Sequence, residues 1–271
     1  MVHSQDQRAA LVIAHPGHEL RIHHWLELAR PLTFILTDGS GHSDRSRLHA
    51  STATLQNAGA KRGSIYGAMS DRELYRAILG GERELFVKLA DDLALALQCE
   101  GVTCVVGDAV EGFNPGHDVC RLVVNAAVAR IDGTGGDSLK NMEFTVEGPP
   151  QPQPRLPQDR AEAEILELDD EGFARKVAAV RAYPQLAAEV DRVLTTEAVE
   201  TFRTEYLFPV QYGFDLANRF EHPCFYEQYG EKQVAAGFYR DVIRFKDHVA
   251  PLAAHLERFV GANSRAANPT R

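Results

Sequence analysis

The stretch Leu11–Glu19, with the sequence LVIAHPGHE, joins a short apolar run to a turn that carries two histidines. The run is apolar throughout, as in a parallel strand that is buried on both faces. A second run of this kind, Val102–Val106, precedes the turn Gly112–Asp118, with the sequence GFNPGHD. Ligands of open α/β sheets bind beyond the carboxyl ends of the strands. The two turns are therefore expected to meet at one sheet edge and to bring together His15, His18 and His117.

Three imidazoles at one sheet edge indicate a metal site. Neutral imidazole is a common zinc ligand, and three protein ligands with a fourth position left to water are typical of a catalytic zinc. The sequence therefore predicts a single divalent metal, Zn²⁺, bound by His15, His18 and His117, and it favours metal-assisted hydrolysis. The neighbouring histidines are expected to be structural: His23, His24, His42 and His49.

The region from Ala9 to about Ile131 alternates short apolar runs with amphipathic stretches, which is typical of βαβ units. The predicted fold is an α/β, Rossmann-like one, with a largely parallel sheet, flanking helices and a C-terminal helical or mixed extension. Strands are expected at residues 11–14, 33–37, 64–67 and 102–106, and helices at residues 18–29, 47–58, 84–98 and 120–130.

A proline-rich stretch, residues 148–158, divides the chain. It is expected to be an extended connector between a Rossmann-like metal-site domain, residues 1–147, and a remainder, residues 159–271, that packs on the same domain. Beyond the connector we expect a strand at residues 164–168 and a helix at residues 171–194, broken near Pro184. Helical spacing over residues 231–260 is expected to be interrupted by Pro251.

The composition is that of a globular protein, with 44% hydrophobic residues among 271 and a formal net charge of -9. This acidity argues against a nucleic-acid partner and against binding to anionic membrane surfaces. No apolar run is long enough to cross a membrane, and the first residues do not resemble a signal peptide, so a cytoplasmic location is expected. The four cysteines form no C-x-x-C pair and are expected to be packing thiols.

The two histidine turns resemble the LmbE-like, PIG-L family of zinc-dependent N-acetyl-sugar deacetylases, whose motifs are A-H-P-D-D-E and H-P-D-H. Three further stretches resemble the family: Leu36–Gly41, Arg47–Gly59 and Lys176–Gln185. The resemblance covers about the first 130 residues and residues 173–205. It implies a zinc-dependent hydrolase that acts on a small-molecule substrate, an N-acetylated sugar or sugar conjugate. It also implies that His15 is the first ligand, that His18 replaces an aspartate ligand, and that His117 is the last ligand.

The chain departs from the family pattern at three positions of the motifs. Gly17 stands where the family has its general-base aspartate, Asn114 where it has an oxyanion-stabilising histidine, and Gly116 where it has the aspartate before the last ligand. A side-chain base contributes roughly 10²–10⁴-fold to a rate. Glu111 or Asp38 is therefore expected to replace the base, with Glu19 and Asp108 as further candidates, while Asn114 could still donate a hydrogen bond to an oxyanion.

Two other functions fit the same residues. The chain could be a catalytically degenerate, sugar-binding protein of the same fold. It could also be a metal-free transferase that uses the glycines at the strand ends to approach a nucleotide-sugar, although it contains no G-x-G-x-x-G motif or P-loop. Metal content separates the transferase from the other two.

Overall fold

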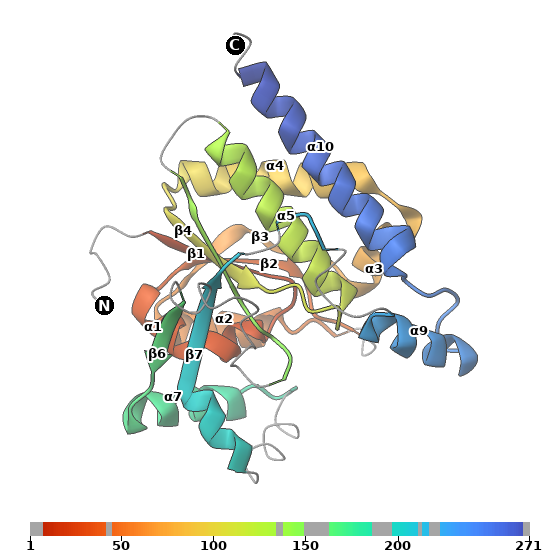
Figure 1. Ribbon diagram of the computed structural model, residues 1–271. Helices are drawn as coiled ribbons and strands as arrows, with labels where there is room; N and C mark the ends of the chain where they lie inside the picture. The colour runs from red at the N-terminus through yellow and green to blue at the C-terminus, as the bar shows by residue number, and fades with distance from the viewer. Residues whose placement is uncertain are drawn as a thin grey trace.

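The computed structural model describes residues 8–41, 45–133, 138–148, 163–185, 197–210, 213–216 and 223–267, and of residues 197–198 and 263–267 only the backbone. Its described strands form one seven-stranded sheet in the order β3-β2-β1-β4-β5-β7-β6 (Figure 1). The strands are β1 (Ala9–Ile13), β2 (Leu32–Thr37), β3 (Lys61–Met69), β4 (Cys104–Asp108), β5 (Lys140–Phe144), β6 (Glu164–Glu167) and β7 (Thr204–Pro209). The helices are α1 (His23–Ala29), α2 (Leu48–Ala58), α3 (Asp71–Gly80), α4 (Arg83–Cys99), α5 (Pro115–Asp132), α7 (Asp170–Arg181), α9 (Phe225–Ala235) and α10 (Ala250–Ala267).

The strand pairing confirms the predicted α/β, largely parallel fold. Strands β3, β2, β1, β4 and β5 are parallel, whereas β7 pairs antiparallel with β5, and β6 antiparallel with β7. In β1, Leu11 lies between Thr33 of β2 and Val106 of β4. The chain order reverses between β1 and β4, and such a reversal opens a crevice at the carboxyl ends of the two strands.

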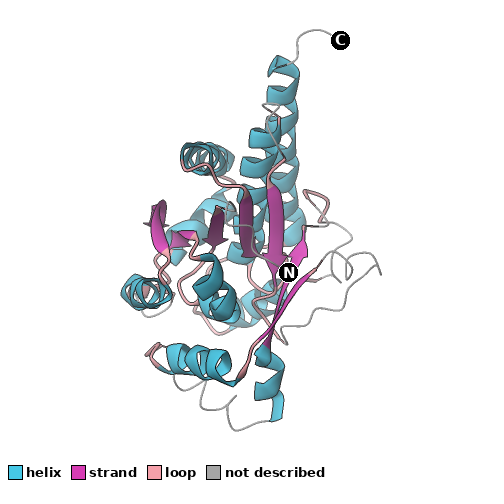
Figure 2. Cartoon of the chain, turned by 90° about the vertical axis from the view of Figure 1, so that its left-hand side faces the viewer, coloured by secondary structure: helices cyan, strands magenta, loops and turns pink. Residues whose placement is uncertain are grey.

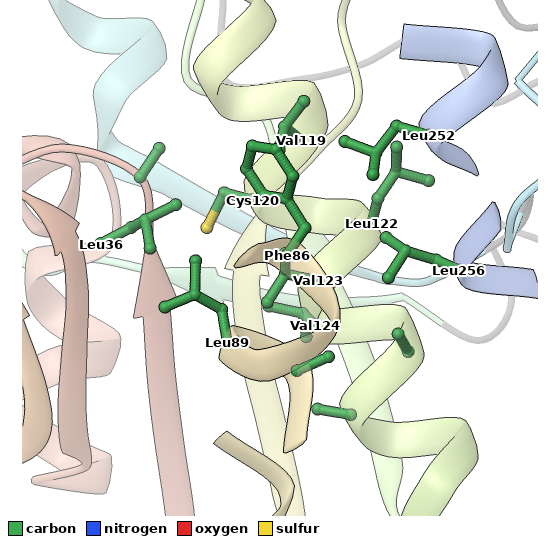
Figure 3. Packing of buried hydrophobic residues seen from close by; sticks show 14 of the residues in the cluster. Leu36, Phe86, Leu89, Val119, Cys120, Leu122, Val123, Val124, Leu252 and Leu256 are labelled. Carbon is green, nitrogen blue, oxygen red and sulfur yellow. The ribbon is translucent and has the colours of Figure 1, made fainter. Parts of the chain in front are cut away.

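Side chains of β1 alternate between two hydrophobic cores, as the pleat of a strand requires. Ala10 and Val12 belong to the larger core, which includes residues of α4, α5 and α10, while Leu11 and Ile13 face the core that includes residues of α1 and α2. Figure 1 shows these two groups of helices on opposite sides of the sheet, and Figure 2 shows the strands in a row between the helical layers. Figure 3 shows the larger core, where Phe86, Val124 and Leu256 come from three different helices.

The predicted helix over residues 18–29 is wrong as one continuous element. Residues His18–Ile22 form a 3₁₀ helix, and α1 starts only at His23. Ile22 has a non-helical backbone, with φ -122° and ψ 40°. Glu205 of β7 accepts hydrogen bonds from the backbone N–H groups of His24 and Trp25 at 2.9 and 2.8 Å. A carboxylate from a distant strand therefore replaces the local cap that the start of α1 lacks.

The helix expected over residues 120–130 begins five residues earlier, at Pro115. Asn114 is its N-cap, because its side-chain oxygen accepts a hydrogen bond from Gly116 N at 2.7 Å, and proline is favoured at the first helical position. His117 consequently lies in the first turn of α5 rather than in a loop.

Pro251 is the second residue of α10, which continues directly from a π-helical turn, Phe245–Val249. The helix therefore changes type just before the proline and continues through it.

Several elements after the predicted boundary join the sheet. β6 agrees with the strand expected at residues 164–168, and α7 accounts for the first part of the expected helix, ending at Arg181 before Pro184. The proline-rich stretch from Pro149 to Pro157, His42 and residues 186–194 lie outside the described residues. No helix in the described ranges is sufficiently long and apolar to cross a membrane.

Candidate metal centre

Three imidazoles meet beyond the carboxyl ends of β1 and β4. His15 follows β1, His18 begins the 3₁₀ helix after the turn at Gly17, and His117 lies in the first turn of α5. The ring centres are 4.5 Å apart for His18 and His117, 5.3 Å for His15 and His117, and 5.4 Å for His15 and His18. The structure thus places the three predicted ligands side by side, at the point where the strand order reverses.

The His15 ring is held by two groups from neighbouring strand ends. Its Nδ1 lies 2.9 Å from Oδ1 of Asp71 and 2.8 Å from Oγ1 of Thr37. Burial by itself would raise the pKa of Asp71, but the hydrogen bond and charge of His15 and further hydrogen bonds bring that pKa well below its usual range. Asp71 is therefore ionised and only accepts hydrogen bonds, so Nδ1 of His15 carries the proton. The other ring nitrogen, Nε2, contacts neither of these two groups.

The His18 ring is held in the same way by Asp108, the last residue of β4. Nδ1 of His18 lies 3.0 Å from each carboxyl oxygen of Asp108. One of these oxygens also accepts a hydrogen bond from the backbone N–H of Ala14 at 2.7 Å. Since both contacts use Asp108 as an acceptor, Nδ1 of His18 is the donor and its Nε2 remains a lone-pair nitrogen.

Burial disfavours the charged form of two rings of the cluster, His18 and His117. Burial lowers the pKa of His18, and this effect outweighs the opposing influence of Asp108. The pKa of His117 lies well below its ordinary value, because the ring is buried and because His18 and His15 are its neighbours. Neutral imidazole is the form that binds metal ions.

Two nitrogens of the cluster are buried without a hydrogen-bond partner, namely Nε2 of His15 and Nδ1 of His117. Leaving a buried polar atom unpaired costs about 1–3 kcal/mol, so such atoms in a native protein call for an explanation such as a bound ion. As the side chains stand, no three His, Cys, Asp or Glu residues of the described ranges are arranged to hold a metal ion. The donor types and the two unpaired nitrogens fit a divalent ion, and the ring positions do so only after a side-chain adjustment.

Gly116 and Asn114 border the cluster on the α5 side. A Cβ atom on Gly116 would lie 3.0 Å from Nε2 of His15 and 3.1 Å from Oδ1 of Asn114, so glycine leaves this side open. Oδ1 of Asn114 accepts hydrogen bonds from Gly116 N and, at 3.2 Å, from the hydroxyl of Tyr75. The side-chain oxygen of Asn114 is thus committed to these two donors, and its amide nitrogen is the group left to meet a substrate.

Glu111, one of the two expected substitute bases, is bound to the loop after β5. Its carboxyl oxygens accept hydrogen bonds from Val146 N at 3.1 Å and from Glu147 N at 3.2 and 3.3 Å. Burial raises the pKa of Glu111 to about 8, against the opposing effect of these hydrogen bonds. Glu111 is therefore protonated at neutral pH, where it can donate a proton but cannot accept one.

The other candidate acids hold backbone groups. Oδ1 of Asp38 accepts a hydrogen bond from Ser40 N at 2.9 Å, within the turn that follows β2. Glu19 is fully buried and accepts one from Gly17 N at 2.7 Å, and burial raises its pKa. Asp108 is the candidate acid that contacts the cluster directly.

Sequence reasoning did not single out Asp71 or Thr37. Asp71 is the first residue of α3, and a local signal for that helix was available. Ser70 and Glu73 form a capping box, in which the side chain of each bonds to the backbone N–H of the other. That signal marks a helix start directly after β3, although it does not reveal that Asp71 contacts His15.

The comparisons with known proteins support the fold. No family model and no curated protein matches the chain. Among solved structures, a deacetylase triple mutant of the teicoplanin biosynthetic pathway is 17% identical, with a TM-score of 0.53 and coverage of 75% of this chain and 97% of the other. The A40926 pseudoaglycone deacetylase Dbv21 is also 17% identical, with a TM-score of 0.53 and coverage of 75% and 96%.

A third solved structure is the zinc-inhibited form of teicoplanin deacetylase, at 17% identity, a TM-score of 0.51 and coverage of 74% of this chain and 97% of the other. At this level of identity, these likenesses establish a shared fold. The chain thus has the architecture of these deacetylases, and its function has to be argued from the cluster itself.

Proposed function

We propose that this protein is a metal-dependent hydrolase that removes the acyl group from an N-acylated amino sugar or sugar conjugate. The observation that carries the proposal is the convergence of three imidazoles, two of them with unpaired buried nitrogens, on a fold shared with deacetylases. His15, His18 and His117 would hold the ion. When bound, a zinc ion supplies a Lewis acid and a water of lowered pKa.

The chain's own residues would orient the substrate and handle protons. The amide nitrogen of Asn114, whose oxygen is occupied by Gly116 N and Tyr75, is positioned to donate a hydrogen bond to the carbonyl oxygen of the substrate. Glu111, with its raised pKa, holds a proton at neutral pH that a leaving amine needs. We therefore propose Glu111 as a general acid, rather than the base that its position alone suggested.

The position of the missing base favours a second candidate, a catalytically degenerate, sugar-binding protein. Gly17 has φ 108°, a backbone conformation that residues with a side chain rarely adopt. An aspartate at this position would add strain of about 1–3 kcal/mol. Gly17→Asp would therefore restore a carboxylate only by straining the turn, because the backbone at this position favours glycine.

The test separates the two candidates. Purified protein loaded with zinc is incubated with a panel of N-acetylated sugars and sugar conjugates, and released acetate and bound zinc are both measured. Hydrolysis that His117→Ala abolishes together with zinc binding supports the hydrolase. Zinc and sugar binding without any release of acetate supports the degenerate protein, and failure of the parent to bind zinc contradicts both metal-based readings.

A further inference from the structure

Two carboxylates contact two of the three imidazoles, each at the ring nitrogen Nδ1. Asp71 contacts Nδ1 of His15 at 2.9 Å, and Asp108 contacts Nδ1 of His18 at 3.0 Å. The side chains of both acids are sequestered, with 10% of Asp71 and none of Asp108 exposed. No acid is paired in this way with His117 in the described part of the chain, where Nδ1 of that ring has no partner.

We infer that Asp71 and Asp108 are positioning residues that hold Nδ1 of His15 and of His18 and so present Nε2 of both rings to a divalent cation in the cluster. The inference rests on the proposed function for the presence of the ion. A metal-ligating histidine commonly donates its second ring N–H to a carboxylate, which orients the ring and raises its basicity. Here the two carboxylates leave Nε2 of both rings as the nitrogen free to bind.

The anchoring of Asp108 explains why it is suited to this role. One carboxyl oxygen is fixed by Ala14 N, the residue before His15, and the backbone of Asp108 is fixed by Arg121. The acid that orients His18 is thus tied to the end of β1 and to α5. Asp71 is tied similarly, since its second carboxyl oxygen accepts a hydrogen bond from Gly41 N at 2.6 Å.

The donor set also determines which cation the cluster would take. Three imidazole nitrogens with no direct carboxylate favour zinc and neighbouring transition metals over magnesium or calcium, which prefer oxygen ligands. We expect zinc to bind in the presence of a large excess of magnesium.

The experiment has two readouts that do not depend on activity. In metal-free protein, long-range ¹H–¹⁵N correlation spectra of the imidazoles report the tautomers, and His15 and His18 are expected to be protonated on Nδ1. In a competition with a chromogenic chelator, Asp71→Asn and Asp108→Asn are each expected to weaken zinc binding by about 10–100-fold. The control is Asp132→Asn, because Asp132 bonds to the backbone N–H of Leu139 at the far end of α5 and is expected to leave the zinc affinity unchanged.

The outcomes separate this inference from the proposed function. Protonation of His15 or His18 on Nε2 in the parent, or zinc affinities of both asparagine variants within twofold of a zinc-binding parent, would overturn the inference. Backbone ¹H–¹⁵N spectra that match the parent show that the variants are folded. Zinc binding that responds as expected, without hydrolysis of any N-acyl sugar, would support the inference while refuting the hydrolase.

Discussion

At the scale of single residues, the histidine cluster depends on the absence of a side chain at Gly116. Gly116 leaves room for the His15 ring, because any side chain there would start 3.0 Å from Nε2 of His15 and 3.2 Å from Cδ2 of Leu74. Gly116 cannot be enlarged without displacing one of these groups or Asn114. Glycine at this position is therefore a requirement of the cluster rather than of the helix.

Gly116→Ala is expected to weaken zinc binding, because the added methyl group would lie 3.0 Å from Nε2 of His15 and would push that ring aside by a few tenths of an ångström. Isothermal titration with zinc measures the effect. The matched control is Gly80→Ala in α3, where a Cβ has only the flexible side chain of Glu82 nearby, at 3.7 Å. An affinity for zinc equal to that of the parent in Gly116→Ala would show that His15 is not a ligand.

Glu111 gives the stability of the protein a pH dependence. In the unfolded chain its carboxyl group loses its proton near the ordinary value of 4.5, whereas in the folded protein burial keeps the proton to about pH 8. Folding therefore takes up a proton between these values, and the contribution of Glu111 to stability falls, by the order of a few kcal/mol, as the pH rises from about 4.5 to 8.

Glu111→Gln removes that proton uptake. Urea unfolding at pH 5 and at pH 8 is expected to show a smaller loss of unfolding free energy in the variant than in the parent. Gln also keeps an oxygen that accepts from the loop after β5, so the comparison between the two pH values isolates ionisation from hydrogen bonding. If the unfolding free energy fell equally in the parent and in the variant between pH 5 and pH 8, Glu111 would be ionised in the folded state.

The histidines of the cluster could be predicted from sequence, whereas their supports could not. An apolar run followed by a histidine turn is a local pattern, and two such patterns predict a common sheet edge. Asp71 reaches His15 only because β3 lies beside β2, and β2 beside β1. Sequence alone does not give that strand order, and therefore did not distinguish Asp71 from other acids.

At the scale of elements, the start of α1 depends on a buried ion pair. Glu205 is fully buried and accepts from two backbone N–H groups of α1, while Nζ of Lys176 in α7 lies 2.8 Å from its Oε1. Nζ of Lys176 also donates to the backbone oxygen of Arg21 at 2.7 Å. Three segments that are distant in sequence are thus joined at the turn between the 3₁₀ helix and α1.

Glu205→Ala is expected to lower the free energy of unfolding by about 3–5 kcal/mol, because it leaves the ammonium group of Lys176 buried without its partner. Lys176→Met is expected to cost less, since Glu205 keeps its two backbone donors. Urea unfolding monitored by circular dichroism measures both. A larger loss for Lys176→Met than for Glu205→Ala would show that the backbone contacts of Glu205 contribute little.

The element boundaries show where sequence patterns reach their limit. The central strands β1 and β2 are continuous apolar runs and were predicted within two residues at each end. β5 (KNMEF) and β7 (TEYLFP) were not predicted, because each mixes charged and apolar residues and takes its place by pairing with neighbouring strands, β5 with β4 and β7, and β7 with β5 and β6. The break before α1 was missed for the same reason, since its cap comes from β7.

At the scale of the whole molecule, the two sides of the proline-rich stretch share one sheet. β7 pairs with β5, and Leu207 of β7 is buried in the same core as Leu11 and Ile13 of β1. Some of the apolar surface of the first 148 residues is therefore covered by residues that follow. We propose that the two parts fold as one unit, with the proline-rich stretch as a connection within it.

Residues 1–148 expressed alone are consequently expected to expose apolar surface and to lose protection of α1. Binding of a hydrophobic dye and amide hydrogen exchange of His24 and Trp25 measure these two effects against the full chain. Exchange of these amides at the rate of the full chain would show that the first part folds on its own.

The contact between Glu205 and α1 also has a consequence for the order of events during synthesis. The acceptor for His24 N lies 181 residues further along the chain. At about 5–20 residues per second, the ribosome takes roughly ten to forty seconds to add those residues. During that interval His15, His18 and α1 have already been synthesised, whereas the Glu205 carboxylate that accepts hydrogen bonds from α1 has not. The start of α1, a few residues after His15 and His18, can therefore gain its final hydrogen-bond acceptor only late in translation.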